Sequence, residues 1–213
     1  MTGPQDPRTL AAPGAATIDE VYRSVGRALS SWQSVEAALA SIFGMAVSEI
    51  AYVAKYSIGR EAALHAYAAP GALEVRLQLA QAAVGRNFAD AYTVFARKER
   101  SSDRFGGYLA GLEVDFTTLL DETRKLSLRQ AEIVRGAAQL HDGSYFLGPA
   151  KNPFEAHPLS NATERNDTIA YRYAAVDIEH VADGFLDLAN RLNKFLERFD
   201  EMRGTMRALL NRK

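Results

Sequence analysis

The stretch that decides the fold runs from Asp177 to Leu209 and reads DIEHVADGFLDLANRLNKFLERFDEMRGTMRAL. Its apolar residues recur at alternating steps of three and four, the spacing of a helix with one continuous apolar stripe. The members of this C-terminal stripe are Ile178, Val181, Phe185, Leu188, Leu192, Phe195, Phe199, Met202, Met206 and Leu209. Such a stripe has to be covered by another helix. The sequence therefore predicts a long last helix, capped at or near Asp177, within an all-helical bundle.

A second apolar stripe, between Ile18 and Phe43, is the expected companion of this helix, in an antiparallel arrangement. Thr17 followed three residues later by Glu20 has the form of a capping box, which predicts where the first helix starts. For the part of the C-terminal stripe beyond Phe199 there is an alternative, a seam between two copies of the chain.

Three further helical segments are expected between these two stripes. One runs from about Val47 to Ala68 and ends before an Ala-Pro-Gly breaker. The next covers Ala72–Arg100, either as one helix or as two with a joint near Gly85. The third extends from Ser101 to Val134, with a joint near Ser127. The expected fold class is all-α, a bundle of five to six helices.

The segment from Ala137 to Thr168 lacks a helical period and is rich in Gly, Pro, Asn and Asp, the residues of turns and loops. We expect a short irregular excursion here, before the long last helix. Two runs with strand character, Ser144–Leu147 and Ile169–Tyr173, predict that part of it forms a two-stranded β-ribbon.

Composition places the chain among ordinary globular proteins, with 47% apolar and 24% charged residues in a length of 213. Lys and Arg number 25 against 26 Asp and Glu, so no overall field attracts nucleic acid or anionic lipid. The absence of cysteine excludes disulfides, thiolate metal sites and cysteine nucleophiles. Residues 1–16 carry three prolines and are expected to be a disordered leader, followed by a single helical domain over residues 17–213.

The longest apolar stretch, Val35 to Ala54, does not predict a membrane span. It is interrupted by the carboxylates Glu36 and Glu49 and by two serines, which are costly at bilayer depth. We expect buried helix here, no contact with a membrane and a cytoplasmic location.

The chain has four histidines, His65, His141, His157 and His180. No His-Glu-x-x-His pair is present, which excludes that type of zinc protease. A di-metal site in a helical bundle needs two carboxylate-x-x-His pairs, and only Asp177 with His180 has this spacing. No metal or other cofactor is expected.

Two groups of charged residues suggest structural partners. Glu36 adjoins the first stripe, so it is either a functional carboxylate with a raised pKa or the partner of an interior arginine, such as Arg129 or Arg135. On the last helix a row of arginines is expected to complement the C-terminus of that helix, with phosphate binding as the alternative. This row is Arg203, Arg207 and Arg212.

Residues 128–196 carry a resemblance to a known family. A helix ending LRQAEIVRGA is followed by GSYFLGPAKNP and then by TIAYRYAAVDIEHVADGFLDLANRLNKFL. This order resembles the bacterial HEPN-like proteins, all-helical proteins in which a helix carrying Arg-Asn-x-x-Ala-His-Gly precedes an extended stretch and a long closing helix. The resemblance extends loosely over Ile18–Phe199 and is better from Leu128 onward.

HEPN domains that cut RNA use an Arg and, five residues later, a His on one helix near a dimer axis. Alignment on Ile133 and Gly136 puts the family's Arg position on Gln130 and its His position on Arg135. Glutamine cannot neutralise a phosphate, and arginine does not lose its proton to act as a base. The resemblance thus implies a homodimer without the nuclease chemistry. The resemblance also implies a ligand-binding cleft near four residues, Arg129, Gln130, Glu132 and Arg135.

The function we expect is that of a catalytically inactive HEPN-like binding or regulatory protein, which contacts RNA, a nucleotide or a protein partner. One alternative is a metal-independent ribonuclease that uses Arg60 and His65, which match the Arg-x4-His spacing; a spacing this simple also arises by chance. Another alternative is a structural dimerisation module built on the C-terminal stripe, without a ligand.

Overall fold

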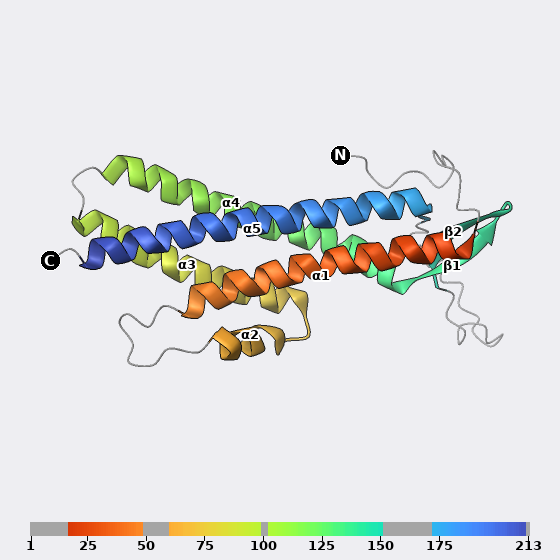
Figure 1. Ribbon diagram of the computed structural model, residues 1–213, viewed down its shortest axis with the longest axis horizontal. Helices are drawn as coiled ribbons and strands as arrows, with labels where there is room; N and C mark the ends of the chain where they lie inside the picture. The colour runs from red at the N-terminus through yellow and green to blue at the C-terminus, as the bar shows by residue number, and fades with distance from the viewer. Residues whose placement is uncertain (1–16, 49–59, 99–101, 151–171, 212–213) are drawn as a thin grey trace, which may run out of the picture. The chain divides into compact units, whose positions relative to one another are not determined.

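The computed structural model describes residues 17–48, 60–98, 102–150 and 172–211 (Figure 1). Within them lie five helices and one antiparallel hairpin, which confirms the expected all-α bundle with a short excursion before the last helix. The elements are α1 (Ile18–Ser48), α2 (Arg60–Ala68), α3 (Leu73–Lys98), α4 (Ser102–Arg135), β1 (Gly136–His141), β2 (Ser144–Pro149) and α5 (Ala175–Asn211). None of these helices combines the length and apolarity that crossing a membrane requires. The expected leader, residues 1–16, lies outside the described residues.

The chain divides into two compact units. The first combines Met1–Trp32 with Leu126–Phe185, and the second combines Gln33–Lys125 with Leu186–Lys213. The hairpin belongs to the first unit, and α2 and α3 belong to the second, whereas α1, α4 and α5 contribute residues to both. Each unit therefore contains a part of the C-terminal stripe.

In the second unit, side-chain contacts give the relative directions of the long helices. The helices α1 and α3 run parallel, whereas α4 runs antiparallel to both α3 and α5. The contacts in order are Glu36–Arg76 and Ala46–Asn87 for α1 with α3, Glu74–Arg124 and Phe95–Phe105 for α3 with α4, and Asp115–Arg198 and Glu122–Arg191 for α4 with α5. Because α1 and α3 are parallel neighbours, the chain between them has to cross back along the bundle, and α2 lies in this crossover.

The short helix α2 packs on the end of α1 in the second unit. The Phe43 and Tyr67 rings lie 5.2 Å apart, and Leu64 lies against the backbone at Gly44. The expected second helix is thus partly wrong in its bounds. Val47 belongs to α1, residues 49–59 lie outside the described residues, and α2 covers the end of the predicted range.

The C-terminal stripe is buried within the chain itself. Of its ten positions only Val181 and Met206 are partly exposed. Phe195 stacks on Phe116 of α4 at 4.7 Å, and beyond Phe199 the side chains of Met202 and Leu209 are 2% and 6% exposed. The distal part of the stripe therefore packs inside a single chain, which supports intramolecular packing over a seam between two copies.

The expected antiparallel pairing of α1 with α5 is wrong. In the first unit Arg27 pairs with Glu179 and Asp183, and Trp32 contacts Phe185 edge to face at 5.1 Å. Residue numbers rise together along both helices, so α1 and α5 run parallel. An apolar stripe fixes which face of a helix is covered, but it carries no information about the direction of the covering helix.

The capping side chains predicted for the starts of α1 and α5 are confirmed. Thr17 and Glu20 form the reciprocal capping box, with N–O distances of 3.2 and 3.3 Å. At the start of α5, the Asp177 carboxylate accepts a hydrogen bond from the Ala174 backbone N–H at 2.9 Å. Asp177 is therefore the third residue of the helix and closes the cap from inside, because the helix begins at Ala175.

The helices α3 and α4 continue without a joint at Gly85 or Ser127. A glycine inside a helix costs about 1 kcal/mol relative to alanine. Val84 and Phe88, which flank Gly85, are buried, and this packing holds the helix through the weak position. The single-helix alternative for Ala72–Arg100 is confirmed, and the joint near Ser127 is wrong.

The main partner of the predicted strand Ser144–Leu147 is different from the one expected. β2 pairs with β1 through a tight turn at Asp142 and Gly143, both at positive φ. Of the expected partner Ile169–Tyr173, residues 169–171 lie outside the described residues. One pairing with that run is present, an isolated bridge between Leu147 and Tyr173. The Asp-Gly pair is a hairpin signal, and it explains why the strand before the turn is the partner.

Substitution of Gly136, at the junction of α4 and β1, tests how closely Leu147 of β2 packs against the backbone at this position. A Cβ there would lie 2.6 Å from Cγ of Leu147, which is fully buried. We expect Gly136→Ala to lower the free energy of unfolding by about 1–3 kcal/mol, the usual cost of overpacking. Urea denaturation measures the change.

Gly85→Ala is the matched control, because nothing lies within 4 Å of a Cβ at that position on α3. It is expected to raise the stability by about 0.5–1 kcal/mol through its higher helix propensity. Equal effects of the two substitutions would contradict the close approach at Gly136.

Candidate functional site

The four residues predicted to bind a ligand lie on the last two turns of α4, in the first unit. Arg129, Gln130 and Glu132 are partly buried, whereas Arg135 is exposed. Gln130 and Arg135 are on one helix, as the resemblance requires, and the Arg135 carbonyl accepts a hydrogen bond from Ala150 N–H at 3.3 Å. The structure thus brings the four residues to one end of α4.

A fifth residue, Tyr173, completes this cluster. Arg129 Nη1 donates a hydrogen bond to the Tyr173 hydroxyl oxygen at 2.6 Å and lies 3.2 Å from Glu132 Oε2. The Tyr173 hydroxyl in turn donates a hydrogen bond to the Glu132 carboxylate. The Arg129 guanidinium also sits over the Tyr173 ring, 5.9 Å from its centroid. Arg129, Glu132 and Tyr173 therefore form a closed triad.

The position of Tyr173 in this triad follows from the hairpin. Its backbone exchanges two hydrogen bonds of 2.9 Å with Leu147 of β2. This bridge holds the residues before α5 against the hairpin, and the Tyr173 side chain, 9% exposed, reaches α4. The triad consequently ties together α4 and the start of α5.

The surroundings of the triad keep Tyr173 protonated and Arg129 charged at neutral pH. Burial raises the pKa of Tyr173, and the hydrogen bond to Glu132 raises it further. Burial opposes the charge of Arg129, but its contacts with Tyr173 and Glu132 outweigh this and raise its pKa. A neutral phenol between a cation and an anion can accept from one and donate to the other. The charges of Arg129 and Glu132 thus compensate each other within the fold.

Glu36 has a different partner from the two suggested by the sequence. It pairs with Arg76 of α3 at 2.9 Å, in the second unit, and not with Arg129 or Arg135. In the same region the hydroxyl of Tyr67 and Nε of Arg76 are buried, and neither has a hydrogen-bond partner among the residues that the structure describes. Burial raises the pKa of Tyr67 to about 12.

Arg203, in the arginine row of α5, contacts the C-terminal end of a different helix from the one expected. Arg203 is 4% exposed, donates a hydrogen bond to the Met45 carbonyl and lies over the Phe199 ring at 5.6 Å. It complements the C-terminal end of α1, where backbone carbonyls lack helical partners. Arg212 lies outside the described residues.

The described histidines do not gather at one place. His65 is exposed on α2, His180 is exposed on α5, and His141 at the end of β1 lies 3.1 Å from the Asp142 carboxylate. His157 and the side chain of Arg60 lie outside the described residues. Among the residues that the structure describes, no three His, Asp or Glu side chains are grouped in a way that could hold a metal ion.

Sequence analysis missed Tyr173 as a member of the site. The pair Arg129 and Glu132 could be recognised, because residues three apart share a helix face. Tyr173 is 41 positions from Glu132, and no local pattern links them.

Comparison of the chain with protein-family models, with curated proteins and with solved structures finds no match.

Two tyrosines allow the triad to be tested with one chemical change. Tyr173→Phe removes a hydroxyl with two charged partners, so we expect a loss of about 1.5–3 kcal/mol in the free energy of unfolding. Tyr67→Phe removes a buried hydroxyl that has no partner in the described part of the chain, and it is expected to be neutral or stabilising. Urea titrations of both variants make the comparison, and a larger loss for Tyr67→Phe would contradict the described hydrogen bonding.

The raised pKa of Tyr67 predicts a loss of stability at alkaline pH. The folded state holds the phenolic proton of Tyr67 more tightly than the unfolded state does. The contribution of this proton to the free energy of unfolding is therefore fully present below pH 10 and is lost as pH rises toward 12. The loss amounts to about 1–3 kcal/mol, at roughly 1.4 kcal/mol per unit of pKa. Denaturant titrations between pH 9 and 11 give the free energy of unfolding as a function of pH. This free energy should fall less steeply with pH in Tyr67→Phe than in the unaltered chain, and equal slopes would refute the raised pKa of Tyr67.

Proposed function

We propose that the chain is a catalytically inactive HEPN-like protein with a binding or regulatory role, that it acts as a homodimer, and that the end of α4 contacts its ligand. The proposal is supported by the residues at the two positions where the resembled nucleases carry Arg and His. Gln130 and Arg135 occupy these positions, five apart on the same helix.

The side chains at these positions support binding without cleavage. RNA hydrolysis needs a group that takes a proton from the attacking hydroxyl and a cation that stabilises the phosphate. Arg135 supplies charge but stays protonated, and Gln130 supplies hydrogen bonds without charge. The observation that carries the proposal is the exposed guanidinium of Arg135 at the end of α4, on the same helix as Gln130.

The remaining two predicted residues have a different part in this proposal. Arg129 and Glu132 satisfy each other and Tyr173, so their charges are engaged within the fold. They position the end of α4, while Gln130 and Arg135 contact the ligand. The Arg135 guanidinium can bind a phosphate-bearing ligand, such as RNA or a nucleotide, although it cannot act as a base. The other class of ligand that it could bind is a protein partner with an exposed carboxylate.

The test is a binding and cleavage assay on purified protein. Fluorescently labelled single-stranded RNA and a set of nucleotides are titrated at fixed salt, because affinity for phosphates depends strongly on ionic strength. We expect binding without cleavage in EDTA, and about a tenfold weaker affinity for Arg135→Ala, the order of one charged hydrogen bond. Sedimentation measures the expected dimer.

Arg86→Ala is the matched control, because Arg86 is equally a surface arginine, paired with Asp90 one turn away on α3. It should bind as the unaltered chain does. If RNA is cleaved in EDTA and His65→Ala abolishes the cleavage, the metal-independent ribonuclease alternative replaces this proposal. If neither RNA nor any nucleotide binds in a way that depends on Arg135, the proposed phosphate contact is wrong.

A further inference from the structure

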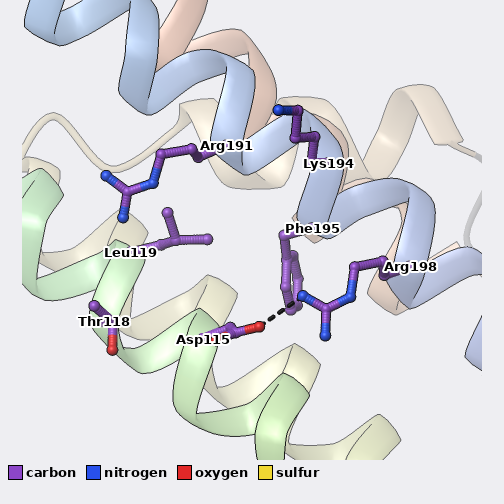
Figure 2. Close-up of a pocket in the computed structure, with 7 residues that line it drawn as sticks. All are labelled: Asp115, Thr118, Leu119, Arg191, Lys194, Phe195 and Arg198. Atoms are coloured by element: carbon purple, nitrogen blue, oxygen red, sulfur yellow. Dashed lines mark hydrogen bonds and ion pairs between the residues drawn. The ribbon is translucent and has the colours of Figure 1, made fainter.

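A charged groove lies between α4 and α5 in the second unit, and none of its residues belongs to the proposed site at the end of α4. Its cavity has a volume of about 260 Å³. Figure 2 shows Arg191 and Arg198 extending from α5 toward α4, on either side of Leu119 and Phe195. The groove is lined by Asp115, Thr118, Leu119, Arg191, Lys194, Phe195 and Arg198.

The lining contains three cations and one carboxylate. Arg191, Lys194 and Arg198 follow one another at steps of three and four, so they share one face of α5. Arg198 lies seven positions after Arg191 on the helix, a rise of about 10 Å. The groove thus presents a row of positive charge two turns long in a chain whose formal net charge is −1.

The existing ion pairs leave donors available in this row. Arg198 Nη1 lies 2.6 Å from Asp115, and Arg191 Nη1 lies 2.7 Å from Glu122 and 3.6 Å from Asp187. All of these side chains are about a third or more exposed. Each guanidinium has five N–H donors, and these carboxylate contacts do not use them all. Within the described part of the chain no carboxylate pairs with Lys194, which is exposed between the two arginines.

The floor of the groove is apolar and fixed. Leu119 and Phe195 are 5% and 2% exposed, and Phe195 stacks on Phe116 beneath the groove at 4.7 Å. The Thr118 hydroxyl donates to the Val114 carbonyl of its own helix at 2.9 Å. The polar contacts available to a ligand therefore come mainly from the cations at the edge, above a surface that does not compete for hydrogen bonds.

We propose that this groove binds a small linear polyphosphate, through Arg191, Lys194 and Arg198. A single phosphate ion is too short to engage two arginines about 10 Å apart, whereas a chain of phosphoryl groups can contact both with Lys194 between them. A nucleic acid is less suitable, since its affinity depends on many phosphate contacts over an extended basic surface. The groove and the end of α4 share no residue, so either proposal can fail without the other.

The test uses isothermal titration calorimetry with inorganic tripolyphosphate, compared with orthophosphate at matched ionic strength and without metal ions. We expect binding of tripolyphosphate that is at least tenfold tighter than that of orthophosphate. Lys194→Gln should weaken it about tenfold, the order of a lost charged hydrogen bond. Asp115→Asn should strengthen it about threefold, because it frees Arg198 and removes the carboxylate of the lining, at little cost to stability for so exposed a pair.

Two control variants match these changes outside the groove. Lys125→Gln removes an exposed lysine of α4, and Asp121→Asn removes a surface carboxylate paired with Arg124 at 2.9 Å. Both should bind tripolyphosphate as the unaltered chain does, with circular dichroism confirming that every variant is folded. The proposal is wrong if tripolyphosphate does not bind, if Lys194→Gln and Lys125→Gln behave alike, or if orthophosphate binds equally well.

Discussion

The burial of one face of α5 is the constraint on which the rest of the structure depends. Ile178 and Phe185 lie in the first unit and Leu188 to Leu209 in the second, and most of these positions are inaccessible to solvent. Burying one such side chain contributes about 1.5–3 kcal/mol. Each unit therefore gains much of its core from the same helix. The contacts that hold α1, α3 and α4 in place, such as Trp32 with Phe185 and Phe88 with Phe199, are contacts to this face or its neighbours.

The sequence predicts helices well where their periodicity is long and predicts their directions poorly. The stripes of α1 and α5 and the capping box at Thr17 are local patterns, and the structure confirms them. The parallel course of α1 and α5 is set by which elements intervene, and no residue within either helix encodes it. Gly85 shows the reverse error, because its weak helix propensity is overridden by burial of Val84 and Phe88. Helix α4 also continues through Ser127, although the neighbouring Leu128 is 68% exposed.

The candidate site shows the same division between local and distant information. A shared helix face places Arg129 near Glu132, and the spacing of these residues makes this readable from the sequence. The hydroxyl of Tyr173 lies beside Arg129 and Glu132 because β2 pairs with β1 and also forms a bridge to Tyr173, just before α5. The groove of α4 and α5 likewise combines Asp115 with Arg198, whose adjacency depends on the antiparallel packing of two helices. Neither set of neighbours follows from periodicity alone.

The sharing of α5 between the two units has a consequence for synthesis of the protein. A domain emerging from the ribosome can usually fold as soon as its own residues are available. Here the first unit needs residues up to Phe185, and the second needs residues up to the last turns of α5. The first unit therefore cannot close before Phe185 is made, and the second cannot close before the last turns of α5 are made. Until then, the apolar faces that α5 covers must stay exposed or be shielded by a chaperone, and a chain truncated before Leu188 would leave the second unit almost without its part of α5.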